Sequence, residues 1–244
     1  MRRLLMSVAA VGILMGAAAS AAKADSITLV RTIGTYSYND YQPWAEIGVN
    51  NFNVTNGTVA TSQFGTVSTT INFAQGGPGS TLLECPATNC TWAGTFGPGD
   101  SILASYNKNS HKGEGAIDLT FSKGLSGIGF EIQGNEYGTF SAEIEAFNGS
   151  TPLGTFYAFN GVSGYDPGSA IFMGLQDLSG ANITGIDILA YNCSGNNGGS
   201  CNGTAVDRLL FETGTPTPEP SSLLLLGSGL GALTFLRRKL FSRS

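Results

Sequence analysis

Apolar and polar residues alternate along much of the chain between residues 25 and 213. In the windows 117–121, 126–133 and 141–147, apolar side chains occupy every second position. A period of two is typical of a β-strand that buries one face and exposes the other. The same pattern predicts further strands at 27–33, 64–73, 101–106, 153–159, 169–176, 183–191 and 205–212. Between the two ends of the chain no window shows the spacing of an amphipathic helix, so we expect an all-β body.

Asparagine–glycine pairs mark the turns between these strands. Such pairs include those at 56–57, 148–149, 160–161 and 202–203. Both residue types tolerate the positive φ that tight hairpin turns require. The four residues Ala-Phe-Asn-Gly occur twice, at 146–149 and 158–161, which we interpret as one strand–turn unit repeated in neighbouring hairpins. No third copy follows, so the repeat does not predict a solenoid.

The composition agrees with a compact β domain. Only 12% of the residues are charged and 35 are glycine, whereas about 25% charged residues are usual in globular proteins. Helical bundles and coiled coils need charged faces and little glycine, so these classes are excluded. The hydrophobic share of 41% excludes general disorder. The segment 25–213 has a suitable length for one sandwich or barrel and is short for two domains.

The charge distribution excludes nucleic acid as a partner. The segment 25–213 holds 16 of the 17 acidic residues but five of the 12 basic ones, a net charge of −11. Nucleic-acid affinity depends on Lys and Arg that displace counterions from phosphates. A body this acidic is repelled by such a backbone.

The N-terminus has the layout of a secretory signal peptide. Basic residues at 2–3 precede an apolar run at 4–22, and small residues flank position 23. This order is typical of a signal peptide with its cleavage site. We expect residues 1–24 to be the signal peptide and Asp25 to be the mature N-terminus. The alternative is an uncleaved N-terminal membrane helix.

The C-terminus contains three features in a fixed order. Residues 214–222 form a proline-rich linker, which we expect to be extended, and an apolar run at 223–236 follows it. At about 1.5 Å per residue this run is shorter than a bilayer core of about 30 Å. We therefore predict a short transmembrane helix at 223–241, with its basic end in the cytoplasm. The motif residues are Pro218, Glu219 and Pro220, and the basic cluster is Arg237, Arg238 and Lys239.

This tail resembles the PEP-CTERM sorting signal of Gram-negative bacteria, which is also labelled an ice-binding-protein C-terminal domain. The residues at 240–244 after the basic cluster are a small departure from the pattern. The resemblance implies recognition by a membrane-embedded exosortase, in organisms that make extracellular polysaccharide. We therefore expect an exported protein that is tethered to the inner membrane in transit and then reaches the cell surface or extracellular matrix.

The body also resembles a known architecture. The run 127–172, together with the strand at 206–211, looks like the jelly-roll sandwiches of PEP-CTERM proteins and carbohydrate-binding modules. We therefore expect residues 25–213 to form a single jelly-roll-like β-sandwich.

The four cysteines form two pairs that are local in sequence. Export to an oxidising compartment favours disulfides, and four cysteines allow three connectivities. The spacing favours local pairing over the other two. A metal site is the alternative, but there is no C-x₂-C pair and only one histidine, so we expect no metal. The expected disulfide residues are Cys85, Cys90, Cys193 and Cys201.

The sequence contains little that indicates catalysis. His111 is the only histidine and lies in a polar stretch. Glu143 and Glu145 fall on one side of a strand, about 7 Å apart, a spacing that glycosidases also use, but such a pair is usually a solvated face. Asp207 shares a strand face with apolar residues, and we expect a hydrogen-bonded structural role. The prediction is a protein without catalytic residues and without a cofactor.

One aromatic cluster is a candidate glycan contact, because sugars stack on exposed rings. The alternative is that these aromatics pack into the sandwich. We predict a non-enzymatic adhesive or polysaccharide-associated protein; the alternative is a carbohydrate-active enzyme, a glycoside hydrolase or lyase with convergent carboxylates. Ice binding would need regularly spaced threonines, which the sequence does not supply. The cluster consists of Tyr36, Tyr38, Tyr41 and Trp44.

Overall fold

The structure is a computed structural model of the chain, and the described part is almost entirely β. It contains two short 3-10 helices, η1 (Ile33–Thr35) and η2 (Trp44–Glu46), besides strands and loops, so the all-β prediction is confirmed. Residues 25–215 form one compact unit. The structure describes residues 27–47, 52–73, 80–86, 96–97, 101–107, 116–164, 169–195 and 201–214.

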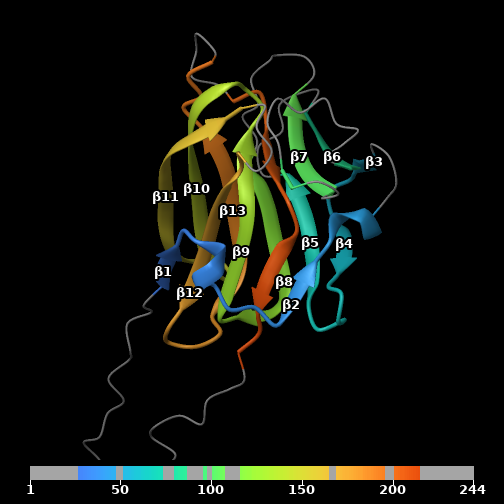
Figure 1. Cartoon of the computed structure of the whole chain (residues 1–244). Coiled ribbons are helices and arrows are strands. Elements are labelled where there is room, and N and C mark those ends of the chain that lie inside the picture. Colours follow the sequence, from blue (N-terminus) through green and yellow to red (C-terminus); the bar gives the residue numbers. More distant parts are fainter. Residues whose placement is uncertain are drawn as a thin grey trace, which may run out of the picture. The chain divides into compact units, whose positions relative to one another are not determined.

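Two antiparallel sheets pack face to face as a sandwich (Figure 1). Sheet A contains β1 (Ile27–Val30), β2 (Asp40–Gln42), β3 (Phe52–Val54), β6 (Ser80–Pro86), β7 (Ser101–Asn107), β9 (Gly127–Gly134), β12 (Ile171–Asp177), β14 (Thr204–Val206) and β15 (Leu209–Glu212). Sheet B contains β4 (Thr58–Thr61), β5 (Ser68–Phe73), β8 (Ile117–Leu125), β10 (Gly138–Asn148), β11 (Thr151–Ser163) and β13 (Ile183–Tyr191).

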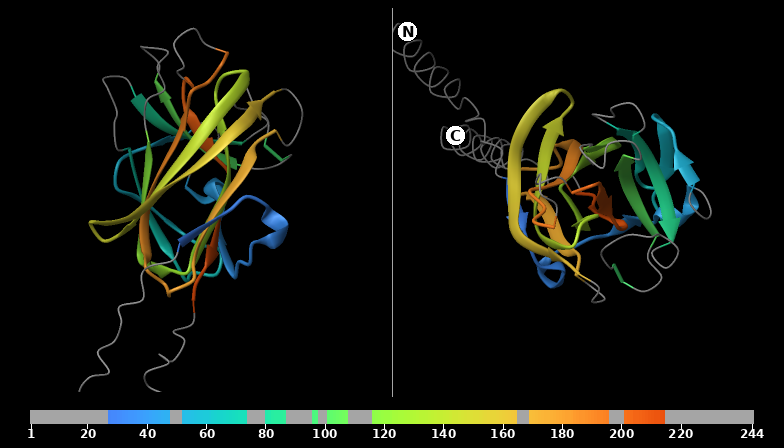
Figure 2. Two further views of the ribbon diagram at one scale, coloured as in Figure 1. Left: turned by 90° about the vertical axis from the view of Figure 1, so that its left-hand side faces the viewer. Right: turned by 90° about the horizontal axis from the view of Figure 1, so that it is seen from above.

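The strand order places the β10–β11 hairpin at one edge of sheet B. Sheet A runs β1-β12-β9-β14-β7-β6-β3, and β15 pairs with both β9 and β2. Sheet B runs β11-β10-β13-β8-β5-β4. From β7 onward successive strands alternate between the sheets, except at the β10–β11 hairpin and at β14–β15. Strand β11, yellow in Figure 2, is therefore an edge strand of sheet B.

The core forms where the alternating apolar positions of the two sheets meet. In β10, Phe140, Ala142, Ile144 and Ala146 are buried, while the residues between them are partly exposed. Strand β9 contributes Ile128, Phe130 and Ile132 from the opposite sheet. Burying each of the isoleucine and phenylalanine side chains contributes about 1.5–3 kcal/mol. The predicted strand windows around these residues are confirmed.

The two Ala-Phe-Asn-Gly segments have different structures. Asn148 and Gly149, whose φ is 59°, make the turn between β10 and β11. Asn160, with φ of 62°, lies inside β11 at a register shift, so the prediction of a second hairpin turn is wrong. An extra residue in one strand is a β-bulge. A Cβ at Gly161 would lie 2.6 Å from the ring of Phe140, which explains why glycine follows the bulge.

The predicted strand at 64–73 is shorter than expected. It begins at Ser68, because residues 62–66 form a turn around the buried Asp40. Asp40 accepts hydrogen bonds from the side chains of Ser62 and Thr66 and from backbone amides. Burial raises the pKa of this carboxyl group, but these hydrogen bonds outweigh it and the pKa is lowered.

The two ends of the chain lie outside the described residues. These ends include the expected signal peptide at 1–24, the linker beyond residue 214, the helix expected at 223–241, and the motif residues at 218–220 and 237–239. Within the described ranges, no helix has the length and apolar character needed to cross a membrane.

Candidate functional site on the outer face of sheet B

Three carboxylates lie side by side on the outer face of sheet B. Glu145 of β10 is directly opposite Asp187 of β13, and Asp187 is directly opposite Asp118 of β8. Asn72 of β5 continues the line beyond Asp118. Their strand neighbours are buried in the core, so these four side chains point away from it. Directly opposite Cβ atoms are about 4.5–5.5 Å apart. We call Glu145, Asp187 and Asp118 the acidic row.

Two members of the acidic row, Asp187 and Asp118, have a raised pKa and so retain protons more readily than isolated carboxyl groups do. Burial, with the charges of Asp118 and Glu145, raises the pKa of Asp187 to about 6. Burial raises the pKa of Asp118. Burial and the charge of Glu145 raise the pKa of Glu143 on the same face. No ion pair within the described residues neutralises these groups.

Three aromatic side chains lie on the same face near Glu143 and Ser141 of β10, further along the strand than Glu145 of the acidic row. Tyr157 of β11 is directly opposite Glu143. The rings of Tyr157 and Phe159 are nearly parallel, with centroids 6.0 Å apart and an interplanar angle of 12°. They are 40% and 54% exposed. Tyr191 of β13 lies opposite Ser141; burial and the nearby Glu143 and Tyr157 raise the pKa of its phenol. We call Tyr157, Phe159 and Tyr191 the aromatic patch.

Local features of the edge strand fix the two exposed rings. Arg31 donates a hydrogen bond from Nη2 to the carbonyl oxygen of Tyr157, at 2.5 Å. The bulge places both Phe159 and Asn160 opposite the single residue Ser141. A bulge redirects side chains within a strand, and here it accompanies the parallel arrangement of the two rings. The backbone that carries the two rings is therefore part of a paired strand and not of a loop.

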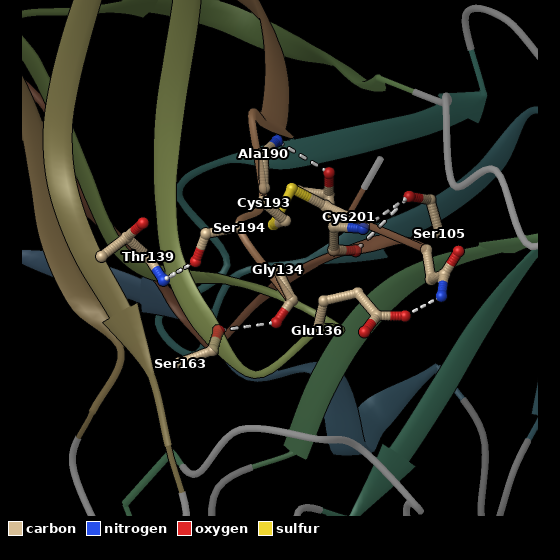
Figure 3. The surroundings of a disulfide bond; sticks show 11 residues. Ser105, Gly134, Glu136, Thr139, Ser163, Ala190, Cys193, Ser194 and Cys201 are labelled. Atoms are coloured by element: carbon tan, nitrogen blue, oxygen red, sulfur yellow. Dashed lines mark hydrogen bonds between the residues drawn. A yellow bond between two sulfur atoms is a disulfide. The ribbon is translucent and has the colours of Figure 1, made fainter. Parts of the chain in front are cut away.

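A buried disulfide fixes the end of the strand that carries Tyr191. Cys193 and Cys201 are bonded, and each is 1% exposed. This is one of the two local pairs expected from the sequence. A Cβ at Gly134 would lie 2.8 Å from the Cys193 sulfur, so glycine makes room for the bond (Figure 3). Cys90 lies outside the described residues, and its pairing with Cys85 stays a prediction.

Hydrogen bonds around the disulfide join four strand ends. The backbone amide of Thr139, near the start of β10, donates to the Ser194 hydroxyl at 2.8 Å. The hydroxyl of Ser163, the last residue of β11, donates to the carbonyl oxygen of Gly134 at the end of β9. Figure 3 shows both bonds in the surroundings of the disulfide. The ends of β11 and β13, which carry the aromatic patch, are thus held to the same cluster.

The aromatic cluster expected to bind glycans is not an exposed surface. Trp44 is fully buried and donates from Nε1 to the backbone oxygen of Asp207 at 2.5 Å. Tyr36 is 6% exposed and packs against Phe172, with ring centroids 5.7 Å apart. For these two residues the alternative prediction is confirmed: their side chains pack into the sandwich. Gly129 leaves room for the ring of Tyr36, because a Cβ at this position would lie 3.3 Å from the ring.

The other two residues of that cluster are separated from the buried pair. Tyr38 is 50% exposed. Tyr41 is half-buried and meets the ring of Phe64 edge-on, with centroids 6.1 Å apart. The structure therefore does not bring the four residues together as a binding platform.

Two buried aspartates, Asp207 and Asp177, accept structural hydrogen bonds from neighbouring segments. Asp207 accepts a hydrogen bond from the backbone amide of Glu131 at 2.8 Å, in agreement with the structural role expected for it. Asp177 accepts from Ser179 and Asn182 and thereby holds the loop after β12. Within the described ranges, no group of three or more His, Cys, Asp or Glu residues is placed to hold a metal ion. His111 lies outside these ranges.

Alternation along residues 141–147 predicts that Glu143 and Glu145 share one strand face, but it does not predict which residues surround them. In the sequence, Asp118 and Asp187 are marked by their polar positions in strands where apolar and polar residues alternate. Their position beside Glu145 depends on the pairing of β8 with β13 and of β13 with β10. This pairing cannot be read from one sequence.

The family model of the PEP-CTERM protein-sorting motif matches residues 216–239. The matched range includes the Pro-Glu-Pro triplet and the basic cluster. The chain therefore carries a motif that marks an exported protein, sorted to the cell envelope and processed by an exosortase, a membrane enzyme.

No curated protein matches the chain. A DUF4465 family protein from Bacteroides caccae is 12% identical, with a TM-score of 0.36, over 77% of this chain and 100% of that one. The catalytic domain of a GH87 alpha-1,3-glucanase in complex with tetrasaccharides is 16% identical, with a TM-score of 0.31, over 62% of this chain and 30% of that one. Structural similarities this weak carry no argument about function.

Proposed function

We propose that this exported protein binds polysaccharide at the outer face of sheet B and serves as a non-enzymatic adhesive or matrix component of the cell envelope. One observation carries the proposal: two exposed, nearly parallel rings, Tyr157 and Phe159, lie beside carboxylates on a regular sheet. Aromatic rings offer an apolar face to the C–H groups of a sugar. Carboxylate and amide oxygens accept hydrogen bonds from its hydroxyl groups.

The extent of this face suits an extended ligand rather than a single sugar. The aromatic patch occupies β11 and β13, and the acidic row continues over β8 to Asn72 on β5. Five neighbouring strands of sheet B, β11 to β5, therefore contribute side chains. With strands spaced by about 4.8 Å, the face is wide enough for several sugar units.

The strand order supports a jelly-roll sandwich. In sheet B the strands β8, β13, β10 and β11 are neighbours in that order, and in sheet A the strands β7, β14, β9 and β12 are neighbours. This is the arrangement of two four-stranded sheets in a jelly roll, an architecture that lectin domains also use. Because one fold hosts many functions, the proposal depends on the site and not on this architecture.

The direction of the carboxylates favours binding over catalysis. Glu143, Glu145, Asp118 and Asp187 all project from one sheet face, so they approach a ligand from the same side. Glycosidases place two carboxyl groups on flanking sides of the bond that they cleave. The outer face of sheet B does not offer that arrangement within the described residues.

A glycoside hydrolase or lyase is the second candidate, and one observation favours it. The pKa of Asp187 is raised to about 6 by burial and by its carboxylate neighbours, a shift typical of a general acid. Polysaccharide cleavage that Asp187→Asn abolishes would support this candidate. Binding without the release of new reducing ends supports the first.

The proposal is tested by affinity electrophoresis of residues 25–215 in gels that contain different polysaccharides. Tyr157→Ala and Phe159→Ala should each weaken binding by about tenfold, as expected for the loss of a stacked ring. The matched controls are Tyr38→Ala and Phe64→Ala, which remove exposed rings of the same type elsewhere. The proposal is wrong if the control variants and the patch variants migrate alike in every polysaccharide.

A further inference from the structure

We propose that the polysaccharide bound at this face is cationic, namely a chain of amino sugars with free amino groups. The inference rests on the proposed function, because it names the ligand class of the same site. It arises from the way in which the aromatic patch and the carboxylates of sheet B are combined.

A charged ligand group at the aromatic patch would meet a carboxylate. Glu143 is directly opposite Tyr157 across the β10–β11 pair. A sugar stacked on Tyr157 therefore carries its ring substituents over Glu143. An ammonium substituent at that point gains from the carboxylate and from the faces of the neighbouring rings. A carboxylate substituent, as in a uronic acid, is repelled there.

The neighbouring sugar units would lie over the acidic row. Glu145, Asp187 and Asp118 are direct neighbours across three strands, and like charges in such positions destabilise a sheet. A ligand with regularly spaced positive charges relieves this repulsion, whereas a neutral glycan does not. The repulsion within the acidic row therefore favours a cationic chain over a neutral one.

The described part of the protein offers this face little positive charge of its own. Its basic residues are Arg31, Lys123 and Arg208. Arg31 donates to the carbonyl oxygen of Tyr157, and Arg208 lies between two strands of sheet A. Lys123 lies near the end of β8, further along the strand than Asp118. None of the three forms an ion pair with the acidic row within the described ranges.

The test compares three hexasaccharides of equal length, built from glucosamine, N-acetylglucosamine or galacturonic acid. Residues 25–215 are titrated with each by calorimetry at about pH 6.5, where carboxyl groups with ordinary pKa values are charged. We expect the glucosamine oligomer to bind about tenfold more tightly than its N-acetylated counterpart, and the galacturonic acid oligomer not to bind.

Three variants separate charge selection from ring stacking and from general attraction to net charge. Asp187→Asn should reduce the preference for the glucosamine oligomer about threefold or more. Glu46→Gln removes the same charge from an exposed position in η2 and should leave the preference unchanged. Tyr157→Ala should weaken binding of the glucosamine oligomer and of the N-acetylated oligomer alike.

The outcomes distinguish the two proposals. If the N-acetylated or galacturonic acid oligomer binds at least as tightly as the glucosamine oligomer, and Tyr157→Ala weakens that binding, the charge inference is overturned while the proposed function stands. If no oligomer or polysaccharide binds, or if Tyr157→Ala leaves all binding unchanged, both are overturned. The third outcome is that Glu46→Gln lowers the preference for the glucosamine oligomer as much as Asp187→Asn does. The protein would then attract the oligomer through its net charge, and the charge inference would also be overturned.

Discussion

Asp187 of β13 lies directly opposite Asp118 of β8, and Glu145 lies on the other side of Asp187. Burial and these two carboxylates raise the pKa of Asp187 to about 6. The folded protein therefore binds a proton at this position more tightly than the unfolded chain does. The resulting stabilisation is complete below the ordinary pKa of about 3.9 and is lost as the pH rises through about 6.

We predict that Asp187→Asn stabilises the protein at neutral pH. The neutral amide removes the repulsion in the acidic row, and the free energy of unfolding should rise by about 1 kcal/mol at about pH 7, because solvent screens part of the charge. Below about pH 4 the variant and the original protein should be equally stable. Urea unfolding at both pH values measures the difference. A gain of the same size at both would show that charge is not its cause.

Glu46→Gln is the matched control for this pH experiment. Glu46 is exposed in η2, and no other acidic residue is its direct cross-strand neighbour. Its removal should not produce a gain in stability that appears only above about pH 6.

The bulge in β11 leads to a second prediction. Gly161→Ala should lower the free energy of unfolding by about 1–3 kcal/mol, because overpacking of a tight core position is destabilising. The new Cβ would lie 2.6 Å from the buried ring of Phe140. Gly34→Ala is the control, since a Cβ at Gly34 has nothing within 4 Å. Equal stability of the two variants in urea unfolding would contradict the explanation given for this glycine.

The bulge also shows where prediction from the sequence reaches its limit. Asn148-Gly149 and Asn160-Gly161 have the same residues before them, yet only the first pair is a turn. What differs is the partner across the strand: Gly161 faces Phe140 of β10. An Asn-Gly pair predicts that the backbone can adopt a positive φ at that point. Tertiary packing then determines whether the chain turns back or continues as a strand.

The candidate site shows the same division between local and long-range information. Alternation in 141–147 correctly places Glu143 and Glu145 on one strand face. The acidic row needs the pairing of three strands, which are far apart in sequence. Trp44 and Tyr36 could not be assigned from the sequence, because their burial depends on space left by distant residues such as Gly129.

The third prediction concerns the disulfides. Peptide mapping without reduction should link Cys193 to Cys201, as in the structure, and Cys85 to Cys90. Replacing Cys193 and Cys201 together by alanine should lower the free energy of unfolding by about 2–3 kcal/mol, the value for a short closed loop. A peptide that joins Cys85 to Cys193 or Cys201, or free thiols in the exported protein, would contradict local pairing.

The last prediction concerns the sorting motif at residues 216–239. We predict that the tail is removed or replaced in the membrane and is not a permanent anchor. The apolar run at 223–236 is shorter than a comfortable span, so a lasting anchor would carry a mismatch cost. A transient substrate needs only enough apolar length to pause in the bilayer, with the basic residues at 237–239 setting its orientation. The alternating prolines before it keep the Pro-Glu-Pro triplet extended and accessible to a processing enzyme. Mass spectrometry of the surface protein from its own host should find a C-terminus upstream of the apolar run. An intact chain that ends at Ser244 would show instead that the tail is a plain anchor.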